Sequence, residues 1–499
     1  MTHGRACSIA VRGIDGQVVA IEADIQRGLP SVHLPDLPGI ALQESGDRVR
    51  VALTNAGEPW PDGKLIVRLS PAQIPVVASV LDLALAAAVS AAAGLIPSAR
   101  PAETVLLGEL AFDGRLRTVR GILPAVLAAR NAGYTTVVVP DTALPEAGLV
   151  TGIDVLGAST LREVLDWLRG RTALTRPTGR PPTIPRPATD LSQVTGRQEA
   201  RRALELAAAG GHHLLLTGPS QSAKTALAQC LPGLLPPLSA EEAMEVAAIQ
   251  SVAGTLDDPH TCLTTAPFIA PHHSTSISAM FGGGTASARP GAVTRAHRGV
   301  LFLDDCTDIN SRVLEALRAP LEEGQVCIAR RDGVVRYPSR FHMMLATTGC
   351  PCDAMRKVDC VCAPLVRRRH LGRLSGPILD RIDLVAQTHP AAKLGWAGEL
   401  ESSATVRERV VAARRVAAAR WRLDGCRTNA EVPGPVLRRR FPLTPQAAAP
   451  LEAALRMGRL SARGVDRTLR VSWTICDLRE GTEPTASDIE QALDLRALH

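Results

Sequence analysis

The feature that most constrains the fold is a short apolar segment, Leu214–Thr217, followed by a polar loop and a helical run beginning at Ala226. The loop reads Gly218-Pro219-Ser220-Gln221-Ser222-Ala223-Lys224-Thr225. A strand, a loop ending in Lys-Thr and a helix together present backbone N–H groups and a helix N-terminus to a nucleotide phosphate. In such a loop the lysine reaches the outer phosphates and the threonine hydroxyl binds Mg²⁺. The spacing fits GxxxxGK[ST] except that Ala223 replaces the second glycine, so the loop alone is weak evidence.

A second apolar segment supports the same interpretation. Val300–Leu303 runs directly into Asp304 and Asp305, which follow the loop in the chain. Doubly wound parallel sheets bind their ligands at the carboxyl ends of their strands. A strand that delivers two carboxylates at this end therefore favours an α/β nucleotide-binding domain.

The sharpest change in composition separates this region from an N-terminal domain. Residues 170–190 are rich in Pro and Thr with interspersed Arg, which neither a helix nor a central strand tolerates, and we predict an interdomain linker there. Hydrophobic periodicity predicts an α/β domain before the linker, a second after it, and mainly helices from about Ala392. The predicted strands are Val18–Ile25, Leu65–Leu69, Thr136–Val139, Leu214–Thr217, Val300–Leu303 and His342–Ala346. The predicted helices are Ile122–Ala132, Gln198–Ala209, Ala404–Arg422, Pro445–Met457 and Val465–Arg479.

The overall composition is that of a globular protein with several cores. A chain of 499 residues with 45% hydrophobic and 21% charged residues is long enough for about three domains and too apolar for disorder. The one candidate membrane span, Val76–Ile96, is mostly Ala and contains Asp82, so we predict a buried helix instead. Nothing before Arg12 resembles a secretory signal. We therefore expect a cytoplasmic protein without a membrane partner.

The charges are unevenly distributed between the parts of the chain. Residues 1–170 hold 14 Lys and Arg against 17 Asp and Glu, whereas the remainder holds 42 against 32. A polyanion would thus meet the second part, although a solvated basic surface is the alternative. The arginine-rich runs at 356–357, 367–370 and 438–440 are candidate phosphate contacts on the same terms.

Several motifs resemble the ComM/YifB family of magnesium-chelatase-like AAA+ ATPases. They include GGHHLLLTGP, PHHSTSISAMFGGG, ARPGAVTRAHRGVLFLDD, LEALRAPLEEG, LSGPILDRIDL and LSARGVDRTLRVSWTICDL. VRGIDGQVVAIEADIQRGLPSVHLPDLPG and LLGELAFDGRLRTVRGILPAVLAARNAG resemble the family's Lon-protease-like domain. The resemblance is collinear over essentially the whole chain. It implies a multidomain α/β fold with a Lon/S5-like domain at 1–169, a linker at 170–190, an AAA+ P-loop core at 191–391 and a C-terminal helical lid at 392–499.

The resemblance also implies an activity and its residues. Family members are ring-forming ATPases, and ComM is associated with branch migration of recombination intermediates. We therefore expect ATP and Mg²⁺ as ligands, a homo-oligomeric ring, a hexamer in the family, and branched or single-stranded DNA as a partner. The implied nucleotide-binding residues are Gly218, Pro219, Ser220, Gln221, Ser222, Ala223, Lys224, Thr225 and the lid residue Arg463. Thr225 and Asp304 would bind Mg²⁺. Asp305 would orient the attacking water, Thr348 would be the first sensor, and Arg381 would be the arginine finger.

Three departures from the family pattern lie on this chemistry. The family loop GPPGxGKT becomes GPSQSAKT, which places Gln221 and Ala223 where the family has glycine. Asp305 replaces a glutamate, and Thr348 replaces the sensor-1 asparagine. Aspartate withdraws its carboxylate by roughly 1 Å relative to glutamate, and a misplacement on that scale can lower a rate about 10²-fold. Three alternatives stay open. The protein hydrolyses ATP slowly, or it is a relic binding module that does not hydrolyse ATP. The third, a magnesium-chelatase subunit, agrees less well with the Lon-like domain.

Four cysteines form the remaining constellation. Seven residues separate the pair Cys350-x-Cys352 from the pair Cys360-x-Cys362. Four soft ligands on one loop can coordinate a tetrahedral Zn²⁺ ion. The pairs are tighter than a CxxC knuckle, so structural zinc and reduced thiols both stay open. His272 and His273 have no carboxylate at ligand spacing, and we assign them no metal.

The Lon-like domain raises proteolysis as a rival activity. Ser79 could match the serine region of that fold, but Leu123 stands where its catalytic lysine is expected. A serine without a base is an alcohol and not a nucleophile, so we expect a non-proteolytic domain.

Overall fold

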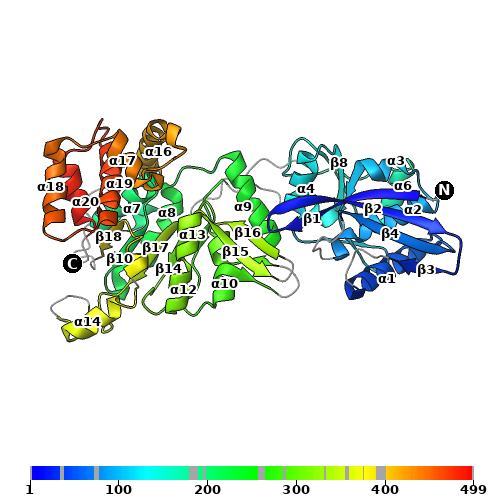
Figure 1. Cartoon of the computed structure of the whole chain (residues 1–499), viewed down its shortest axis with the longest axis horizontal. Helices are drawn as coiled ribbons and strands as arrows, with labels where there is room; N and C mark the ends of the chain where they lie inside the picture. The colour runs from blue at the N-terminus through cyan, green and yellow to red at the C-terminus, as the bar shows by residue number, and fades with distance from the viewer. Residues whose placement is uncertain are drawn as a thin grey trace.

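The computed structural model describes residues 3–33, 39–71, 78–178, 189–194, 198–256, 264–284, 288–330, 333–354, 359–374, 376–388 and 400–496. Two α/β parts lie at opposite ends of a region around α9 (Ala240–Ala253), and a group of helices covers one end of the second part (Figure 1). Residues 179–188 of the predicted linker lie outside the described residues. The multidomain α/β fold is confirmed, whereas the domain boundaries stay a prediction.

The N-terminal part is built on a seven-stranded mixed sheet. Its elements are β1 (His3–Arg12), β2 (Asp15–Gln26), β3 (Ser31–His33), α1 (Gly39–Asn55), β4 (Lys64–Ser70), α2 (Asp82–Ala92), α3 (Ala99–Glu103), β5 (Thr104–Leu106), β6 (Glu109–Leu110), β7 (Leu116–Arg117), α4 (Ile122–Asn131), β8 (Thr136–Pro140), α5 (Leu144–Ala147), β9 (Asp154–Ala158) and α6 (Leu161–Leu168). The strand order is β3-β4-β2-β1-β5-β8-β9. A long antiparallel pair, β1 with β2, joins the parallel strands β5, β8 and β9 through β1.

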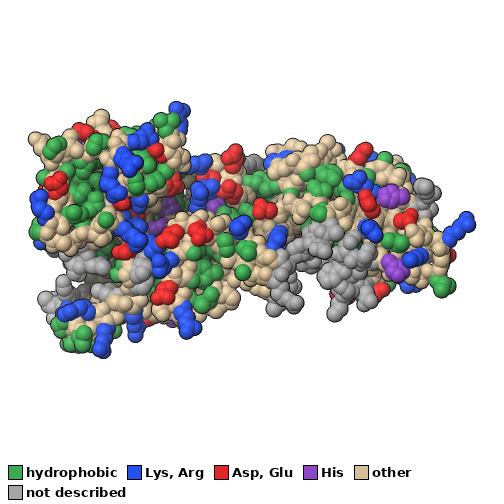
Figure 2. All heavy atoms as spheres, in the orientation of Figure 1, with side chains coloured by type: hydrophobic (Ala, Val, Ile, Leu, Met, Phe, Trp, Pro, Cys, Tyr) green, Lys and Arg blue, Asp and Glu red, His purple; other side chains and the backbone are tan. Residues whose placement is uncertain are grey.

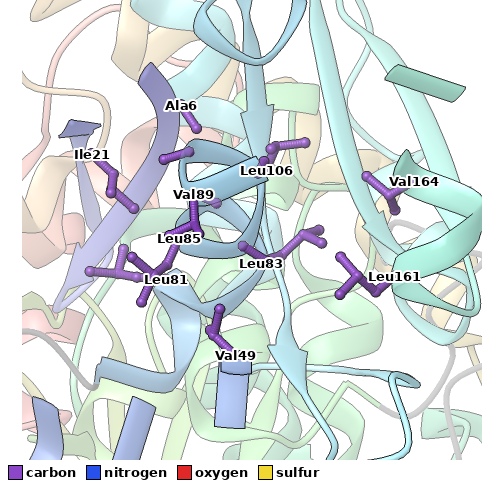
Figure 3. Close-up of a cluster of buried hydrophobic side chains, with 14 of the residues drawn as sticks. Ala6, Ile21, Val49, Leu81, Leu83, Leu85, Val89, Leu106, Leu161 and Val164 are labelled. Atoms are coloured by element: carbon purple, nitrogen blue, oxygen red, sulfur yellow. The ribbon is translucent and has the colours of Figure 1, made fainter. Parts of the chain in front are cut away.

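The core of this sheet is closed by the Ala-rich helix α2. All eleven of its residues are buried, and Leu83, Leu85 and Val89 pack among strand side chains and residues of α6 (Figure 3). Each fully buried Leu or Val contributes about 1.5–3 kcal/mol through removal of apolar surface from water. Buried Asp82 is compensated because Arg48 Nε donates to its Oδ2 at 2.8 Å. The prediction of a buried helix is thus confirmed, and no described helix has the length and apolarity to cross a bilayer.

The second part contains a parallel sheet of five strands in the order β11-β14-β17-β10-β18. Its elements are α7 (Gln198–Gly210), β10 (Leu214–Thr217), α8 (Lys224–Leu234), α9, β11 (Phe268–Ile269), α10 (Ile277–Phe281), β12 (Gly282–Gly283), β13 (Arg289–Pro290), α11 (Ala292–Arg295), β14 (Val300–Leu303), α12 (Ser311–Ala316), α13 (Arg318–Glu323), β15 (Gln325–Arg330), β16 (Gly333–Pro338), β17 (His342–Thr347), α14 (Pro364–Leu371), α15 (Gly376–Leu379) and β18 (Leu384–Gln387). Since β17 lies between β14 and β10, the loops that follow these three strands leave the same edge side by side.

The C-terminal helices pack on the core. They are α16 (Ser403–Arg420), α17 (Gly434–Arg440), α18 (Pro445–Arg456), α19 (Ala462–Leu478) and α20 (Ala486–Asp494). Val406, Val410 and Val471 belong to the same apolar cluster as the strands β10 and β14. A second cluster centres on Trp421, whose ring meets Phe441 edge-to-face at 4.8 Å between centroids. The C-terminal helices predicted from sequence periodicity are therefore anchored to the sheet through α16 and α19.

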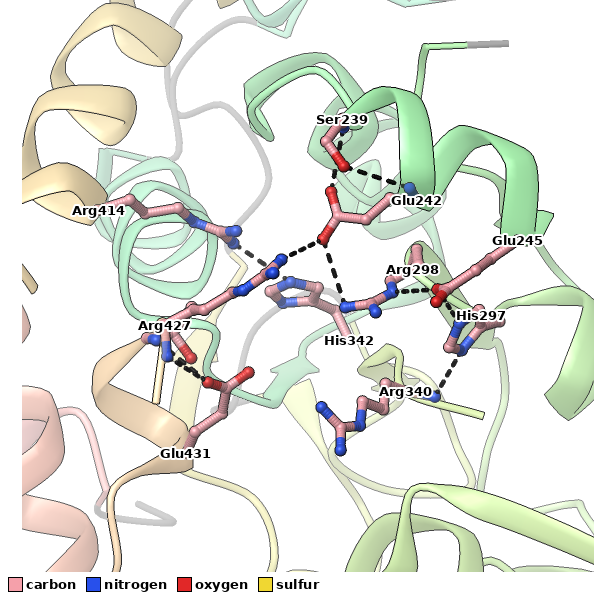
Figure 4. A network of polar contacts seen from close by, with 11 residues as sticks. Ser239, Glu242, Glu245, His297, Arg298, Arg340, His342, Arg414, Arg427 and Glu431 are labelled. Atoms are coloured by element: carbon pink, nitrogen blue, oxygen red, sulfur yellow. Dashed lines mark hydrogen bonds and ion pairs between the residues drawn. The ribbon is translucent and has the colours of Figure 1, made fainter. Parts of the chain in front are cut away.

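Helix α9 connects all three parts. Its Glu242 pairs with Arg298 of the core at 3.3 Å and with Arg427 of the C-terminal region at 2.8 Å (Figure 4). On another face, Ala247 and Ala248 are buried in the apolar cluster of the N-terminal part that contains α4. Partly exposed ion pairs of this kind contribute about 0–1 kcal/mol each, so the apolar contact is the stronger tie.

Candidate functional site

The loop after β10 is held in a fixed shape by the end of β18. A Cβ on Gly218, whose φ is +153°, would lie 2.2 Å from the Thr388 carbonyl oxygen, so only glycine fits there. Ser222 Oγ lies 2.6 Å from both Pro219 O and Thr388 Oγ1. The loop thus turns tightly from the strand into α8, as the sequence motif predicts.

Ala223 occupies a backbone conformation that favours glycine. Its φ of 57° and ψ of 33° are left-handed, and it forms the N-cap of α8. For a residue with a Cβ this conformation costs roughly 1–2 kcal/mol. The departure noted in the sequence therefore carries a backbone strain in addition to the expected crowding of a phosphate by Cβ.

Lys224 is buried and folded over the loop. Its Nζ donates to Gly218 O at 2.8 Å and to Pro219 O at 2.9 Å. Burial lowers the pKa of this ammonium group, opposed by the nearby charges of Asp304 and Asp305. The side chain therefore brings a cation to the carbonyl face of the loop, where it can exchange these acceptors for phosphate oxygens.

Thr225 and Asp304 are in contact although they follow different strands of the sheet. Thr225 Oγ1 donates to Asp304 Oδ2 at 2.8 Å, although β10 and β14 are separated by β17. A hydroxyl and a carboxylate are oxygen ligands of the kind Mg²⁺ prefers, so the donor set fits that ion. The structure brings together the two residues that the sequence assigned to the metal.

Asp305 is exposed next to this pair, with a φ of 44°. Its backbone N–H donates to Asp304 Oδ1 at 3.1 Å. Partial burial and the adjacent Asp304 charge raise the pKa of the Asp305 carboxyl. Aspartate tolerates a left-handed backbone better than glutamate does, which gives a local reason for the shorter acid here.

Thr348 follows β17 at the same edge but is engaged by a residue that the motifs did not assign to the site. His370 Nε2 lies 3.2 Å from both Thr348 Oγ1 and Thr348 O, and 3.4 Å from Thr307 Oγ1. His370 is buried at the end of α14. The sequence showed it only as part of an arginine-rich run, and nothing in that pattern signalled a buried contact.

Asp353 is a second residue that the motifs did not assign to the site. Its Oδ1 accepts a hydrogen bond of 2.8 Å from Ser220 N–H in the phosphate loop. The residue is exposed and left-handed, with a φ of 51°. A carboxylate thus occupies a backbone donor of the loop that the sequence motif predicts to bind phosphate. In the sequence Asp353 only follows the first cysteine pair, and nothing in that pattern signalled a contact with the loop after β10.

The four cysteines converge in the segment that follows β17. The sulfur atoms of Cys350, Cys352, Cys360 and Cys362 all lie within 4.8 Å of one another. Four thiolates at this separation fit a tetrahedral Zn²⁺ site. The hydrogen bond with Cys350 lowers the pKa of Cys352 to about 6, which favours the thiolate that a metal requires. Among the described residues, this is the only convergent group of three or more metal-ligating side chains.

Arg381 and Arg463 lie at the opposite edge of the sheet. β18 pairs with β10 from Leu384 to Gln387, so the turn before Leu384 is at the amino end of the strands, away from the phosphate loop. Both arginines line one polar cavity of about 260 Å³ together with Glu322. Arg381 is buried in an ion pair with Glu322, whereas Arg463 is exposed, 3.8 Å from Asp380. Arg463 therefore does not reach the phosphate loop of its own chain, and its assignment to nucleotide binding stays a prediction.

Residues set aside at the sequence level have ordinary environments. His272 Nδ1 lies 2.7 Å from Ser274 Oγ, and the rings of His272 and His273 are 4.0 Å apart. Leu123 is fully buried in an apolar cluster of the N-terminal part. Ser79 is half-buried in a short turn of 3₁₀ helix.

Comparison with protein families gives three matches that together span most of the chain. Residues 190–394 match the model of magnesium chelatase, subunit ChlI. Residues 21–143 match subunit ChlI of Mg-chelatase, and residues 400–496 match the C-terminal region of magnesium chelatase subunit ChlI.

Curated proteins with similar sequences include full-length relatives. An uncharacterized protein of Mycobacterium tuberculosis is 55% identical over 99% of both chains. The competence protein ComM of Haemophilus influenzae is 35% identical over 98% of this chain and 97% of its own. A Lon protease of Mycolicibacterium smegmatis is 28% identical over 33% of this chain and 21% of its own length.

Proposed function

The chain belongs to the ComM/YifB family of magnesium-chelatase-like AAA+ proteins, and from this premise we propose that it binds ATP with Mg²⁺, assembles as a ring and acts on DNA. The observation that carries the proposal is the convergence of Lys224, Thr225 and Asp304 at one edge of a parallel sheet. A lysine binds the outer phosphates of a nucleoside triphosphate, and a hydroxyl and a carboxylate bind its Mg²⁺, which is the arrangement found here.

Each residue has a distinct task in this proposal. The N–H groups that begin α8 receive the phosphates, and Lys224 exchanges its loop carbonyls for phosphate oxygens. Thr225 and Asp304 hold Mg²⁺, which when bound neutralises charge on the outer phosphates. Asp305, with its carboxylate close to Asp304, orients water toward the outermost phosphate.

The cavity lined by Arg381 and Arg463 supports the proposal that the protein assembles as a ring. Arg381 and Arg463 cannot serve the phosphate loop of their own chain, because they lie at the other edge of the sheet. In a ring, that edge of one subunit can face the nucleotide of the next, where a guanidinium stabilises developing negative charge. We therefore assign both arginines to a neighbouring subunit's ATP, with a hexamer as the family expectation.

The departures at Ala223, Asp305 and Thr348 make hydrolysis slow in this proposal. The alternative is a module that binds nucleotide without hydrolysing it, and the observation in its favour is that Thr348 is engaged by His370. A metal-inserting chelatase subunit is the remaining alternative, suggested by the family description alone.

DNA enters the proposal through the charge of the second and third parts. Residues 171–499 hold an excess of ten basic over acidic side chains, and phosphate contacts would release counterions. ComM is named a competence protein. We extend to this chain the expectation of branched or single-stranded DNA as its substrate.

The proposal is tested by coupling between nucleotide, assembly and DNA. Sedimentation velocity gives the mass of the assembly, and fluorescence anisotropy gives the affinity for a branched DNA. Both are measured at one salt concentration with ATP, with ADP and without nucleotide. We expect ATP to increase both, because a ligand shifts an equilibrium only through differential affinity.

Two variants locate the coupling at the subunit boundary. Arg381→Ala should abolish the effect of ATP on assembly, and Arg381→Lys, which keeps the charge, should retain part of it. Arg115→Ala, which removes an exposed arginine of the N-terminal part, is the matched control. Equal assembly mass and equal DNA affinity in all nucleotide states would contradict the DNA-acting ATPase and leave the non-hydrolysing module.

A further inference from the structure

Helix α14 presents an exposed basic surface beside the nucleotide site. It carries Arg367, Arg368 and Arg369 in succession, and none of the three is ion-paired with a carboxylate of the described residues. Leu365 and Val361 next to them are 57% and 91% exposed. The helix projects from the body of the second part, and Lys and Arg side chains gather on the lobe that it forms (Figures 1 and 2).

The opposite side of α14 is fixed to the loops of the site. His370 Nε2 contacts Thr348 at 3.2 Å and Thr307 at 3.4 Å. Just after the helix, Arg373 Nη1 pairs with Asp308 at 3.1 Å. Thr307 and Asp308 lie in the same loop as the carboxylates Asp304 and Asp305, separated from them by Cys306, so one end of α14 is attached to two of the three loops at the carboxyl edge.

The other end of α14 is attached to the same edge through the cysteines. Cys360 and Cys362 precede the helix and lie against Cys350, which follows Thr348 by two residues. The sulfurs of Cys360 and Cys350 are 3.3 Å apart. The helix therefore cannot shift as a body without moving the segment that carries Thr348.

We infer that α14 is a nucleic-acid contact and that His370 is a positioning residue that transmits occupancy of its arginines to Thr348. The inference rests on the proposed function and names the surface and the connection through which DNA and nucleotide are coupled. The sugar-phosphate backbone of DNA is the partner that these guanidinium groups complement, half-buried in Arg367 and exposed in Arg368 and Arg369, through charge-assisted hydrogen bonds to phosphate oxygens. The exposed apolar side chains beside them are compatible with contact to sugars or bases of a single strand.

DNA and nucleotide binding are connected through the hydrogen bonds of His370, which can shift between Thr348 and Thr307. Phosphates that bind the arginines on the exposed face of α14 displace the helix, and buried His370 at its end moves with it. Because Nε2 contacts both the Thr348 and Thr307 hydroxyl groups, a small rotation of the helix changes which of them is satisfied. Coupling is reciprocal, so the position of Thr348 set by ATP also changes the affinity of α14 for DNA.

The surface is tested with two matched triple variants of the full-length protein. One replaces Arg367, Arg368 and Arg369 by Ala. The other replaces Arg438, Arg439 and Arg440 at the end of α17, where Arg438 and Arg440 are paired with Asp466 and Asp424. Anisotropy with a labelled branched DNA and with a labelled oligonucleotide is measured from low to moderate salt. We expect the first variant to lose at least tenfold in affinity and to flatten the salt dependence, and the second to lose less than threefold.

The role of His370 is tested by the ratio of DNA dissociation constants in ADP and in ATP. We expect a ratio of about five or more in the parent protein. His370→Ala should bring the ratio to about one while DNA affinity without nucleotide changes less than twofold. His370→Gln, whose amide nitrogen approximates Nε2, should restore most of the ratio, which a merely structural role would not predict. Unchanged thermal melting of both variants is the control for folding.

The outcomes separate this inference from the proposed function. Equal losses in the two triple variants would overturn α14 as the contact, and a parent-like ratio in His370→Ala would overturn the connection, with the DNA-acting ATPase intact in both cases. A parent protein that binds neither ATP nor DNA would overturn the proposed function and this inference together.

Discussion

Removing the carboxylate of Asp353 should strengthen ATP binding. Asp353 Oδ1 accepts a hydrogen bond from Ser220 N–H, a donor of the phosphate loop, at 2.8 Å. A phosphate that approaches this loop therefore competes with a resident anion. Two substitutions divide the effect, because Asn and Gly both tolerate the left-handed backbone at this position. Asp353→Asn removes only the charge, whereas Asp353→Gly removes the charge and the acceptor.

The magnitude follows from two contributions. An exposed hydrogen bond between a carboxylate and an N–H contributes about 1 kcal/mol, which ATP must displace. A displaced carboxylate that stays about 6 Å from a phosphate repels it by about 0.7–1.4 kcal/mol at an effective dielectric constant of about 40–80. Because about 1.4 kcal/mol is tenfold in affinity, we expect Kd for ATP to fall about fivefold in Asp353→Asn and about thirtyfold in Asp353→Gly.

Isothermal titration calorimetry in Mg²⁺ at low and moderate salt measures both effects. The gain in Asp353→Asn should shrink as salt rises, because it is electrostatic at an exposed site. Asp15→Asn, which neutralises an exposed carboxylate of the N-terminal part, is the control and should leave Kd unchanged. Dissociation constants within twofold of the parent in both Asp353 variants would refute the competition, and weaker binding would show that the carboxylate supports the loop instead.

Three further predictions concern the loop, the catalytic geometry and the cysteines. Ala223→Gly should stabilise the protein by about 0.5–1 kcal/mol in chemical denaturation, because relief of about 1–2 kcal/mol of left-handed strain exceeds the entropy cost of glycine. Ala226→Gly inside α8 is the control and should destabilise the protein. A destabilising effect of Ala223→Gly would refute the strain. Asp305→Glu, alone or with Ala223→Gly and Thr348→Asn, should raise kcat about tenfold in a phosphate-release assay, and a triple variant no faster than the parent would end the argument from degenerate geometry. Elemental analysis should find one zinc ion per chain in the parent protein and none in Cys352→Ser. After chelation of the metal, the rate at which Cys352 reacts with iodoacetamide should rise with pH, with a midpoint near pH 6. A metal-free parent protein would show that the four cysteines are reduced thiols.

The sheet of the second part was predictable because its strands are short, apolar and fully buried. Leu214–Thr217 and Val300–Leu303 were predicted to the residue, since a parallel strand covered on both faces is a continuous apolar run bounded by loops. The hairpin of β15 and β16 was missed, because its strands mix exposed polar and apolar side chains and, in the part of the chain that the structure describes, pair only with each other.

The candidate site was predictable where one loop or one strand end carries the chemistry. Lys224 and Thr225 could be read from the sequence because they end the loop that follows β10, and Asp304 because it directly follows β14. His370 and Asp353 could not, because their contacts depend on how the segment between β17 and β18 folds back over the sheet. The edge at which Arg463 lies could not be predicted either, since it is set by the packing of α19 against the amino end of β18.

The central claim is that the edge of the parallel sheet binds ATP through Lys224, and calorimetry with ATP in Mg²⁺ tests it most directly. We expect the parent protein to bind ATP, Lys224→Ala to lose at least tenfold in affinity, and Lys64→Ala, which changes a lysine of the N-terminal sheet, to bind as the parent does. Equal affinities in the parent and Lys224→Ala, or no binding by the parent, would contradict the account.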